Sequence, residues 1–592
     1  MPYPTSWNLS RYFYSWLDDT RLQSDIEKIL PTTYIFRDIY KNTLANFQKP
    51  EEILQFYKDY ENLQYSIGTP GYYLFYLSSL DTQNTEVLKK MGELQFLHTE
   101  ASNELLFISQ AWKAIGVTKI MEWSTSPLLA WYKNDLISTA ENLKYILSEK
   151  EERTLNIKSR PLSLANDLHD ELTGSFEFSM TINGEEKKLT EEEVRSYRQH
   201  TDRTIREEAY KSLRRVYNSK QNQITLGNIY TSIVKDWSTD IQLRGYTTVM
   251  EPRNISEEMD NTTIDTLMKE VTNAYPLYNR FLKAKARILW IQDFAVWDTG
   301  APIGSTDKDY SFDEAFNLHL SVMKDFDDEF YEYSQKMIEE ERIDVFPKAG
   351  KRGGAYASYR KWDESFVLLN FTGKLRDVAT ISHELWHAIH GHLSQVQEWA
   401  VYDSPLSLAE TASIFSEMLL WEKIKTMISK EEYIDYLNER LWDIFATIFR
   451  QIQYIVFEKQ VHELIHSGKE LTYKELNVLW RNEQEKLFGE SVRFDVEKEN
   501  ESGWSMIPHI FHTPFYCYAY AFWNILTFSL YNLVQSGKLS VEDYKNILRA
   551  GWSETPKNLL AKYWIDITDS QFYKAGIEEI EKLVSEFESL IS

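Results

Sequence analysis

The strongest chemical signal in the sequence is the pentapeptide His383-Glu384-Leu385-Trp386-His387, an H-E-x-x-H pattern. Residues four apart on a helix lie on one face, so the two imidazoles can share one zinc ion. The glutamate can act as general base on a water that zinc has activated. The alternative is a chance match on an amphipathic helix, because the bare pattern is short.

The helix predicted to carry this pattern begins near Asp377 and ends near Gly391. At roughly 100° per residue, its apolar residues fall on one side: Val378, Ile381, Leu385, Ala388 and Ile389. The histidines fall on the other side: His383, His387 and His390. The helix can therefore bury one face and present both imidazoles of the motif to a cleft.

A second copy of the pattern, His462-Glu463-Leu464-Ile465-His466, serves as an internal control. It runs directly into Ser467-Gly468-Lys469, which is a helix stop, and no predicted strand pair leads into it. We therefore interpret the second copy as structural.

A third metal ligand is available downstream of the first copy, at Glu410. Pro405 can open a helix there, and Glu410 has small and apolar neighbours among which an unpaired carboxylate is costly to bury. The alternative is a partly exposed helix glutamate. Glu417 lies two turns further on, near the same face, where it either orients a ligand or forms a plain salt bridge.

Most of the remaining sequence predicts helices, because apolar residues recur at spacings of three and four. The predicted segments are Glu51–Leu63, Thr85–Ile115, Leu128–Ser148, Glu192–Val216, Thr263–Leu289 and Phe312–Met337.

Two regions predict strands instead. In Phe176–Leu189, apolar and polar residues alternate up to a turn at Asn183-Gly184, and a capping-box pattern starts a new helix directly afterwards. The second region, Gly350–Tyr359 followed by Ser365–Phe371, precedes the metal-binding helix. A small sheet is therefore expected beside that helix.

The chain has 592 residues, which predicts two or more lobes. We place a boundary near residue 195, with an N-terminal helical lobe over 1–195 and a region over 196–592 that contains the metal motif and completes both lobes. The formal net charge of −25 disfavours nucleic acid and anionic lipid as partners. The same charge also serves solubility.

Cys517 is the single cysteine, so no intramolecular disulfide can form, which fits a reducing compartment, and we expect a cytoplasmic location. The first residues lack the basic and apolar pattern of a signal peptide. Residues 502–537 carry no Asp, Glu, Lys or Arg. A membrane span is one interpretation, but His509, Pro514 and Asn524 interrupt the segment and favour the buried wall of a cleft.

Together these residues resemble the oligoendopeptidase F and thimet oligopeptidase family of zinc metallopeptidases, and oligoendopeptidase F most of all. The matching segments are Pro347–Tyr356, Leu368–Gly373, the His383 helix, Ala409–Ser413, Ile507–His509 and Phe515–Ala521. A weaker likeness extends from about residue 200 to the end. The N-terminal third is compatible in length and helicity but has no sharp motif.

The resemblance implies a mostly α-helical fold of two lobes around a deep channel. It implies one zinc ion per chain, held by His383, His387 and Glu410, with Glu384 as general base. It also implies an intracellular endopeptidase that cuts short peptides, because a narrow channel excludes folded proteins.

In such enzymes a histidine and tyrosines of the C-terminal motif face the zinc across the cleft. Here this implies His509, Tyr516 and Tyr520 as catalytic residues and Tyr518 as a substrate contact. Tyrosine hydroxyls suit an oxyanion stabiliser because they donate a hydrogen bond without being charged. Aromatic core packing is the alternative for each tyrosine.

Gly353, Gly354 and Tyr356 resemble the family's substrate-side segment, where glycines let the backbone pair with an extended peptide. A tight turn without a ligand is the alternative. One departure from the family is Trp386, which replaces the usual glycine of the zinc motif. From its position on the helix we expect the indole near the edge of the site, where it affects packing. His512 is expected to line the cleft.

Three other functions stay open. A dipeptidase or carboxypeptidase with the same chemistry differs only in where it cuts. A peptide-binding protein could have kept the fold and lost activity, although the ligands and the base are all present. A helical scaffold would require every motif to match by accident.

Overall fold

The structure is a computed structural model that describes residues 2–304 and 309–591. The chain is mostly α-helical, with two small sheets among the described residues, as the sequence predicted. It forms two compact units, each assembled from three segments. The first unit comprises Met1–Ile146, Lys308–Lys423 and Ser536–Tyr563, and the second comprises Leu147–Asp307, Ile424–Gln535 and Trp564–Ser592. Within the described ranges, every helix is too short or too polar to cross a bilayer.

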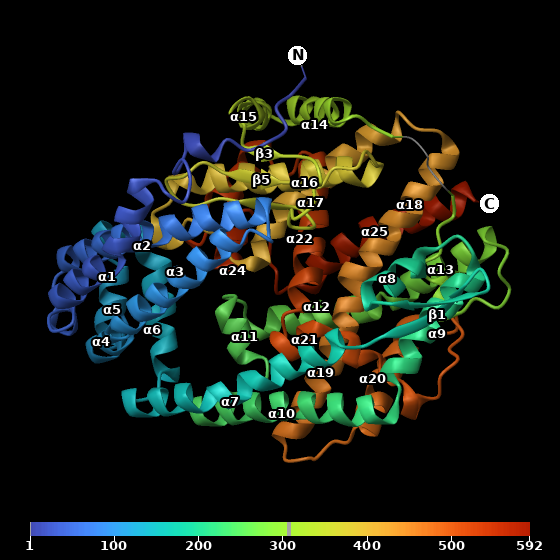
Figure 1. Cartoon of the computed structure of the whole chain (residues 1–592), viewed down its shortest axis with the longest axis horizontal. Coiled ribbons are helices and arrows are strands. Elements are labelled where there is room, and N and C mark those ends of the chain that lie inside the picture. The colour runs from blue at the N-terminus through green and yellow to red at the C-terminus, as the bar shows by residue number, and fades with distance from the viewer. Residues whose placement is uncertain (1, 305–308, 592) are drawn as a thin grey trace. The chain divides into compact units, whose positions relative to one another are not determined.

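The first unit begins with six helices, which Figure 1 colours blue to cyan. They are α1 (Thr20–Tyr40), α2 (Pro50–Leu80), α3 (Thr85–Glu104), α4 (Phe107–Ile115), α5 (Val117–Ser124) and α6 (Lys133–Asn142). Its later elements are α14 (Phe312–Phe326), α15 (Asp328–Glu339), β3 (Ile343–Asp344), β4 (Tyr356–Ser358), β5 (Phe366–Leu368), α16 (Leu375–Leu393), α17 (Leu406–Lys425), α23 (Val541–Arg549) and α24 (Pro556–Ala561).

A three-stranded sheet in order β3-β5-β4 lies beside α16, as predicted. Strand β5 pairs in parallel with β3 and antiparallel with β4. Phe366 and Leu368 of β5 join the core formed by the N-terminal helices, so the sheet connects that core to α16. A ring contact of 5.1 Å between Tyr76 and Phe366 is part of this packing.

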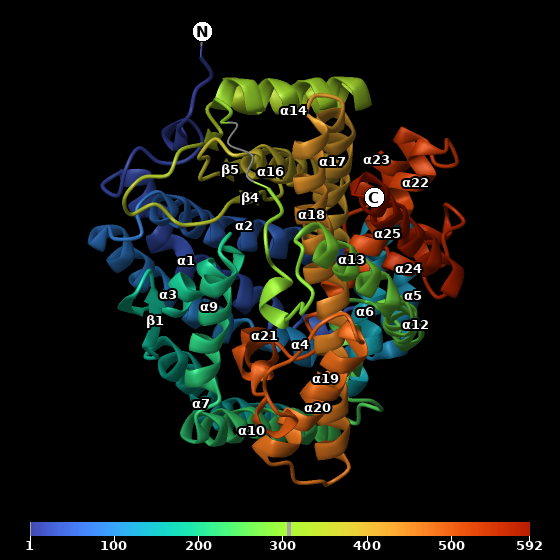
Figure 2. The same ribbon diagram turned by 90° about the vertical axis from the view of Figure 1, so that its right-hand side faces the viewer.

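Helix α16 is also covered by α14 (Figure 2). Gly391, near the end of α16, allows the segment after β4 to approach, because a Cβ there would lie 2.3 Å from the Tyr359 ring. The helix start is capped by Asp377, whose carboxylate accepts a hydrogen bond from the Thr372 backbone N–H at 2.7 Å. Helix α16 is thus held at its start, at its end and along one face.

The second unit contains the remaining elements. They are α7 (Glu149–Gly174), β1 (Phe178–Ile182), β2 (Glu185–Leu189), α8 (Glu191–Ser196), α9 (Arg203–Tyr217), α10 (Lys220–Arg244), α11 (Glu251–Ser256), α12 (Asn261–Asn273), α13 (Tyr275–Ile288), α18 (Lys430–Ile444), α19 (Arg450–His466), α20 (Tyr473–Phe488), α21 (Pro508–His512), α22 (Tyr518–Gln535) and α25 (Ser570–Leu590). A π-helical turn, η9 (Phe445–Phe449), joins α18 to α19.

The predicted hairpin of the second unit is present as β1 and β2. Its turn residues Asn183 and Gly184 have φ values of 54° and 83°, which suits a two-residue hairpin turn. The Thr190 side chain then accepts a hydrogen bond from the Glu193 N–H and caps α8, as the capping-box pattern predicted.

Several predicted helices are interrupted. The segment 312–337 is two helices, because Asp327 ends α14 and its side chain accepts a hydrogen bond from the Glu329 N–H at the start of α15. The segment 192–216 is likewise divided into α8 and α9, and Asp202 caps α9. Apolar spacing continues through these breaks, so it predicted the buried faces but missed the caps.

The division of the chain at residue 195 remains a prediction about domain limits. Residues 147–195 pack in the second unit with later segments, and each unit draws on distant parts of the sequence. The chain therefore passes from one compact unit to the other several times, and no single residue separates the two units.

Candidate metal and catalytic site

Helix α16 presents its two faces as the sequence predicted. Its apolar stripe is buried: Val378, Ile381, Leu385, Ala388 and Ile389. His383 and His387 keep 26% and 14% of their side chains exposed, and their ring centroids lie 4.9 Å apart. His390 is buried, and its Nε2 bonds the Ser404 hydroxyl at 2.9 Å, so it has a structural role.

Three ligand atoms converge at this face. The Oε2 atom of Glu410 lies 3.4 Å from His383 Nε2 and 3.2 Å from His387 Nε2. A tetrahedral zinc ion with bonds of about 2.1 Å separates its ligand atoms by roughly 3.4 Å. The two nitrogens and one oxygen therefore fit the ligand set of a zinc site in both chemistry and spacing.

Glu410 reaches this point from α17, which begins directly after Pro405. The Ser413 hydroxyl donates a hydrogen bond of 2.8 Å to Glu410 Oε2. Burial disfavours the charged carboxylate, but hydrogen bonds from His383 and His387 outweigh it and hold the pKa of Glu410 well below its ordinary value. Sequence reasoning did not assign Ser413 a role, although it lies one helical turn after Glu410.

Glu417 lies about two turns after Glu410 on α17 and contacts the other ring nitrogen of His383. Its Oε1 lies 2.6 Å from His383 Nδ1. Burial opposes a charged His383, yet hydrogen bonds to Glu410 and Glu417 raise its pKa well above the ordinary value. A carboxylate that accepts the Nδ1 proton leaves Nε2 free to bind a metal. Of the two interpretations that the sequence left open, the geometry supports the orienting one.

Glu384 lies on α16 between the two histidines and is 8% exposed. Burial raises its pKa, whereas the charges of His383 and His387 and a hydrogen bond from the Ala357 backbone N–H lower it. The net effect is a raised pKa, which suits a carboxylate that must accept and later release a proton.

Trp386 does not lie at the edge of the site as we expected. Its side chain is completely buried in the first unit and packs between aromatic rings. Ring centroids lie 4.9 Å away at Phe330, 5.5 Å at Phe326 and 5.9 Å at Phe415. A position about 60° from the histidine face still belongs to the packed side of α16, because α14, α15 and α17 enclose it.

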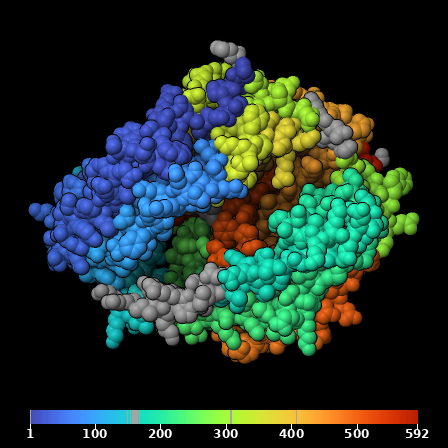
Figure 3. Space-filling model, viewed as in Figure 1, coloured from blue at the N-terminus to red at the C-terminus, as the bar shows by residue number. Residues whose placement is uncertain are grey.

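The glycine-rich segment before α16 lies at the surface of the first unit. Figure 3 shows the chain around residue 350, in yellow, beside the blue N-terminal helices. Gly353 and Gly354 are exposed, with open space where a Cβ would stand. The Asn370 side chain fixes the segment by donating to the carbonyls of Arg352 and Gly354 at 2.9 and 2.7 Å.

Strand β4 follows this segment and forms one edge of the sheet. No strand in the described residues pairs with its outer edge. The Tyr356 ring packs inward, 5.4 Å from Phe75, and burial raises its pKa to about 12. The backbone of β4 can therefore receive an extended peptide, whereas the Tyr356 side chain belongs to the core.

The C-terminal motif lies in the second unit, where three of its side chains cluster. The Tyr520 hydroxyl lies 3.4 Å from His509 Nε2. The Tyr516 ring stacks on His509 at 5.7 Å and meets the Tyr520 ring edge-on at 5.4 Å. Burial, followed by the charge of His512, lowers the pKa of His509 and favours its neutral form.

Tyr518 does not join this cluster. It is completely buried, and burial raises its pKa well above the ordinary value. The second H-E-x-x-H copy does not converge either, because His462 is buried while His466 bonds the Ser238 hydroxyl at 2.9 Å. His512 lies 2.9 Å from Asp170 at a partly exposed position.

Residues 196–579 match the sequence pattern of peptidase family M3. The chain is 29% identical over 428 residues to the chromosomal oligoendopeptidase F of Lactococcus lactis subsp. cremoris, a match that covers 72% of this chain and 70% of that protein. It is 24% identical over 546 residues to oligopeptidase PepF of Bacillus subtilis, covering 90% of this chain and 81% of that protein.

Two solved structures share the fold. A protein from Chlamydophila abortus is similar with a TM-score of 0.89 and 25% identity, over 99% of this chain and 98% of that one. Oligoendopeptidase F from Enterococcus faecium is similar with a TM-score of 0.67 and 21% identity, over 96% of this chain and 97% of that one. The mostly helical fold is thereby confirmed.

Proposed function

Because the chain belongs to peptidase family M3 and is a peptide-cleaving enzyme, we propose that it is a zinc metalloendopeptidase that hydrolyses internal bonds of short peptides. The observation that carries this proposal is the convergence of three ligand atoms. His383 Nε2 lies 3.4 Å and His387 Nε2 lies 3.2 Å from Glu410 Oε2.

The three convergent residues would hold one zinc ion per chain, with Glu417 orienting His383 and Ser413 orienting Glu410. When bound there, zinc supplies Lewis-acid chemistry, which makes a water more acidic and polarises a peptide carbonyl. Both orienting contacts fix ligand atoms before the metal arrives, which lowers the cost of assembling the site.

Glu384 acts as the general base. Its carboxylate accepts a proton from the attacking water and then passes that proton to the amine that leaves as the peptide bond breaks. Its position between the two histidines on α16, together with its raised pKa, supports this role.

His509, Tyr516 and Tyr520 act on the developing oxyanion. The hydroxyls of Tyr516 and Tyr520 donate hydrogen bonds to it, and neutral His509 holds the Tyr520 hydroxyl. The mutual packing of the three rings supports a preorganised group. We leave Tyr518 out of the proposed substrate contacts because its side chain is buried.

A peptide substrate pairs with the backbone of Gly353, Gly354 and strand β4 as an added strand. Glu384 interacts with the Ala357 N–H of the same strand, so a peptide paired there would lie beside the general base. Tyr356 contributes its backbone, while its ring anchors β4 to the core.

Short peptides are the proposed partners, and we propose a cytoplasmic location. The single cysteine, Cys517, supports a reducing compartment. Nucleic acid and membrane are not proposed as partners, because the net charge of −25 opposes both.

The position of the cut tests the endopeptidase proposal. Peptides of about ten residues with blocked ends should be cut at internal bonds, and mass spectrometry identifies the fragments. Removal of dipeptides or single C-terminal residues only from unblocked peptides would favour the dipeptidase or carboxypeptidase alternative. Zinc binding without any cleavage would favour a peptide-binding protein.

A further inference from the structure

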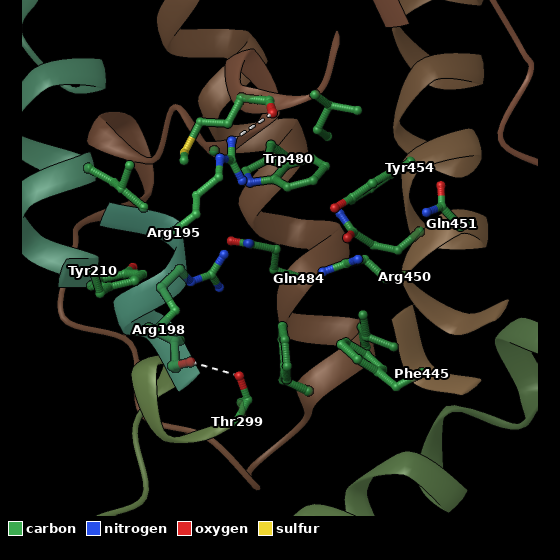
Figure 4. A pocket seen from close by; sticks show the side chains of 18 of the residues that line it. Arg195, Arg198, Tyr210, Thr299, Phe445, Arg450, Gln451, Tyr454, Trp480 and Gln484 are labelled. Carbon is green, nitrogen blue, oxygen red and sulfur yellow. Dashed lines mark hydrogen bonds between the residues drawn. The ribbon is translucent and has the colours of Figure 1, made fainter. Parts of the chain in front are cut away.

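A cavity lies entirely within the second unit and is lined by arginines (Figure 4). It has a volume of about 290 Å³. We call it the arginine pocket and define it by Arg195, Arg198, Arg214 and Arg450, together with Gln484 and Trp480. The residues that line it include neither aspartate nor glutamate. In a chain with a net charge of −25, such a concentration of positive charge calls for an explanation.

Two of the four arginines have carboxylate partners and two do not. Arg195 pairs with Glu191, and Arg214 pairs with Glu501 at 2.6 Å. Among the described residues, neither Arg198 nor Arg450 forms an ion pair. Figure 4 shows both of these side chains pointing toward Gln484, from opposite sides of the pocket.

Burial and the neighbouring arginines both lower the pKa of Arg198. Burial lowers its pKa to about 10, and the positive charges of Arg195, Arg450 and Arg214 add to that effect. Guanidinium groups remain protonated at neutral pH, so the pocket holds uncompensated positive charge. The Arg198 and Arg450 side chains are partly buried, where a charge without a partner is unfavourable, and an anion in the pocket would reduce that cost.

Hydrogen-bond donors in the lining also lack acceptors. Arg450 Nε and Trp480 Nε1 are buried and have no partner among the described atoms. Gly503 brings two donors close together, because a Cβ there would lie 2.7 Å from Trp480 Nε1 and 2.8 Å from Arg214 Nη1. Arg450 directly follows the π-helical turn η9, a feature that is frequent at functional sites.

The pocket extends to the C-terminal motif, since Ile507, Pro508 and His509 are part of its lining. His509 is one of the proposed catalytic residues, so a group bound in the pocket lies beside that residue of the second unit. A volume of about 290 Å³ is at the lower end of ligand pockets and suits one or two residues of a peptide.

We propose that the arginine pocket binds an anionic group of the peptide substrate, either its C-terminal carboxylate or an acidic side chain, through Arg198 and Arg450. The planar guanidinium matches a carboxylate with two parallel hydrogen bonds. The pocket thereby offsets the repulsion that an acidic protein exerts on an acidic peptide. This inference rests on the proposed function, because that function supplies the peptide and the role of His509.

Binding of matched peptides to the zinc-loaded Glu384→Gln protein tests the inference without requiring turnover. Four fluorescent peptides of one sequence would carry Glu or Gln at one position and a free or amidated C-terminus. The acidic forms should bind about tenfold or more tightly than the neutral ones, as expected for a hydrogen bond between charged groups. Fluorescence anisotropy measures each affinity.

The pocket variants should remove that preference. Arg198→Gln and Arg450→Gln should bind acidic and neutral peptides alike, while Arg198→Lys, which keeps the charge but loses the planar geometry, should retain part of the preference. Arg287→Gln is the matched control, because Arg287 is exposed on α13 and lies outside the pocket. It should leave the preference intact. Circular dichroism verifies that each variant is folded.

Inorganic phosphate distinguishes the source of the anion. Competition between phosphate and the acidic peptides, lost in Arg198→Gln, would support the inference. Phosphate binding without any preference among the peptides would overturn it and assign the pocket to a free anion. An equal preference in the parent and in folded Arg198→Gln would also overturn it. If internal cleavage is normal while the preference is absent, only this inference fails, not the proposed function.

Discussion

Replacing Glu417 by Gln should weaken zinc binding without removing a ligand. In the structure Glu417 Oε1 lies 2.6 Å from His383 Nδ1, which places the Nδ1 proton between them and leaves Nε2 as the proposed zinc ligand atom. The carboxylate makes the imidazole a stronger donor to the metal. Glutamine has the same shape and can accept the same hydrogen bond, but it carries no negative charge.

Loss of such a partner typically reduces metal affinity by about 10- to 100-fold. At 25 °C this corresponds to roughly 1.4 to 2.7 kcal/mol of binding free energy. Competition with a chromophoric zinc chelator at fixed pH measures the affinity of the parent and of Glu417→Gln. Glu422→Gln is the matched control, because Glu422 is an exposed residue on the same helix.

The control should bind zinc as the parent does. A change of less than about twofold in folded Glu417→Gln would contradict the orienting role, and the contact with His383 would then be a simple ion pair. A loss in the control as large as in Glu417→Gln would show that general surface charge, and not the contact with Nδ1, determines the affinity.

Three further outcomes are expected. Trp386→Ala should lower the free energy of unfolding by about 3 to 5 kcal/mol in denaturant titrations. It should leave the zinc content unchanged, because the indole is buried in the core of the first unit and packs among aromatic rings there. Tyr520→Phe should lower kcat by about 100-fold with zinc content unchanged, and a normal kcat in Tyr520→Phe beside a lowered kcat in Tyr516→Phe would leave Tyr516 as the sole oxyanion donor of the two. Burial raises the pKa of Glu458, which accepts a hydrogen bond from the Phe515 N–H, from 4.5 to about 8. The parent should therefore lose stability as the pH rises from 5 through 8, and Glu458→Gln, which cannot ionise, should lose less in thermal melts across that range.

Local signals in the sequence predicted the elements that hold the site. The spacing of His383 and His387 and the apolar stripe of α16 were sufficient to predict which face of α16 is buried and which presents the two imidazoles, because a helix has a fixed rotation per residue. The turn at Asn183-Gly184 predicted the hairpin, since those residues accept positive φ values. Such features depend only on neighbours along the chain.

Features that depend on distant segments were not predictable in the same way. The pairing of β3 with β5 and the burial of Trp386 against Phe326 and Phe330 require knowledge of the tertiary fold. The arginine pocket had no sequence signal, because Arg198 and Arg450 are distant in sequence and meet only through packing of the second unit.

Zinc content and peptide turnover, measured together in the parent and in Glu384→Gln, test most directly whether the protein is a zinc peptidase with Glu384 as its general base. We expect about one zinc ion per chain in both proteins, as the three-ligand set requires, with internal cleavage of short peptides in the parent and none in the variant. Removal of zinc by a chelator should abolish cleavage in the parent, and added zinc should restore it. Normal turnover in zinc-loaded Glu384→Gln, or a parent that cleaves peptides without any metal, would contradict the claim.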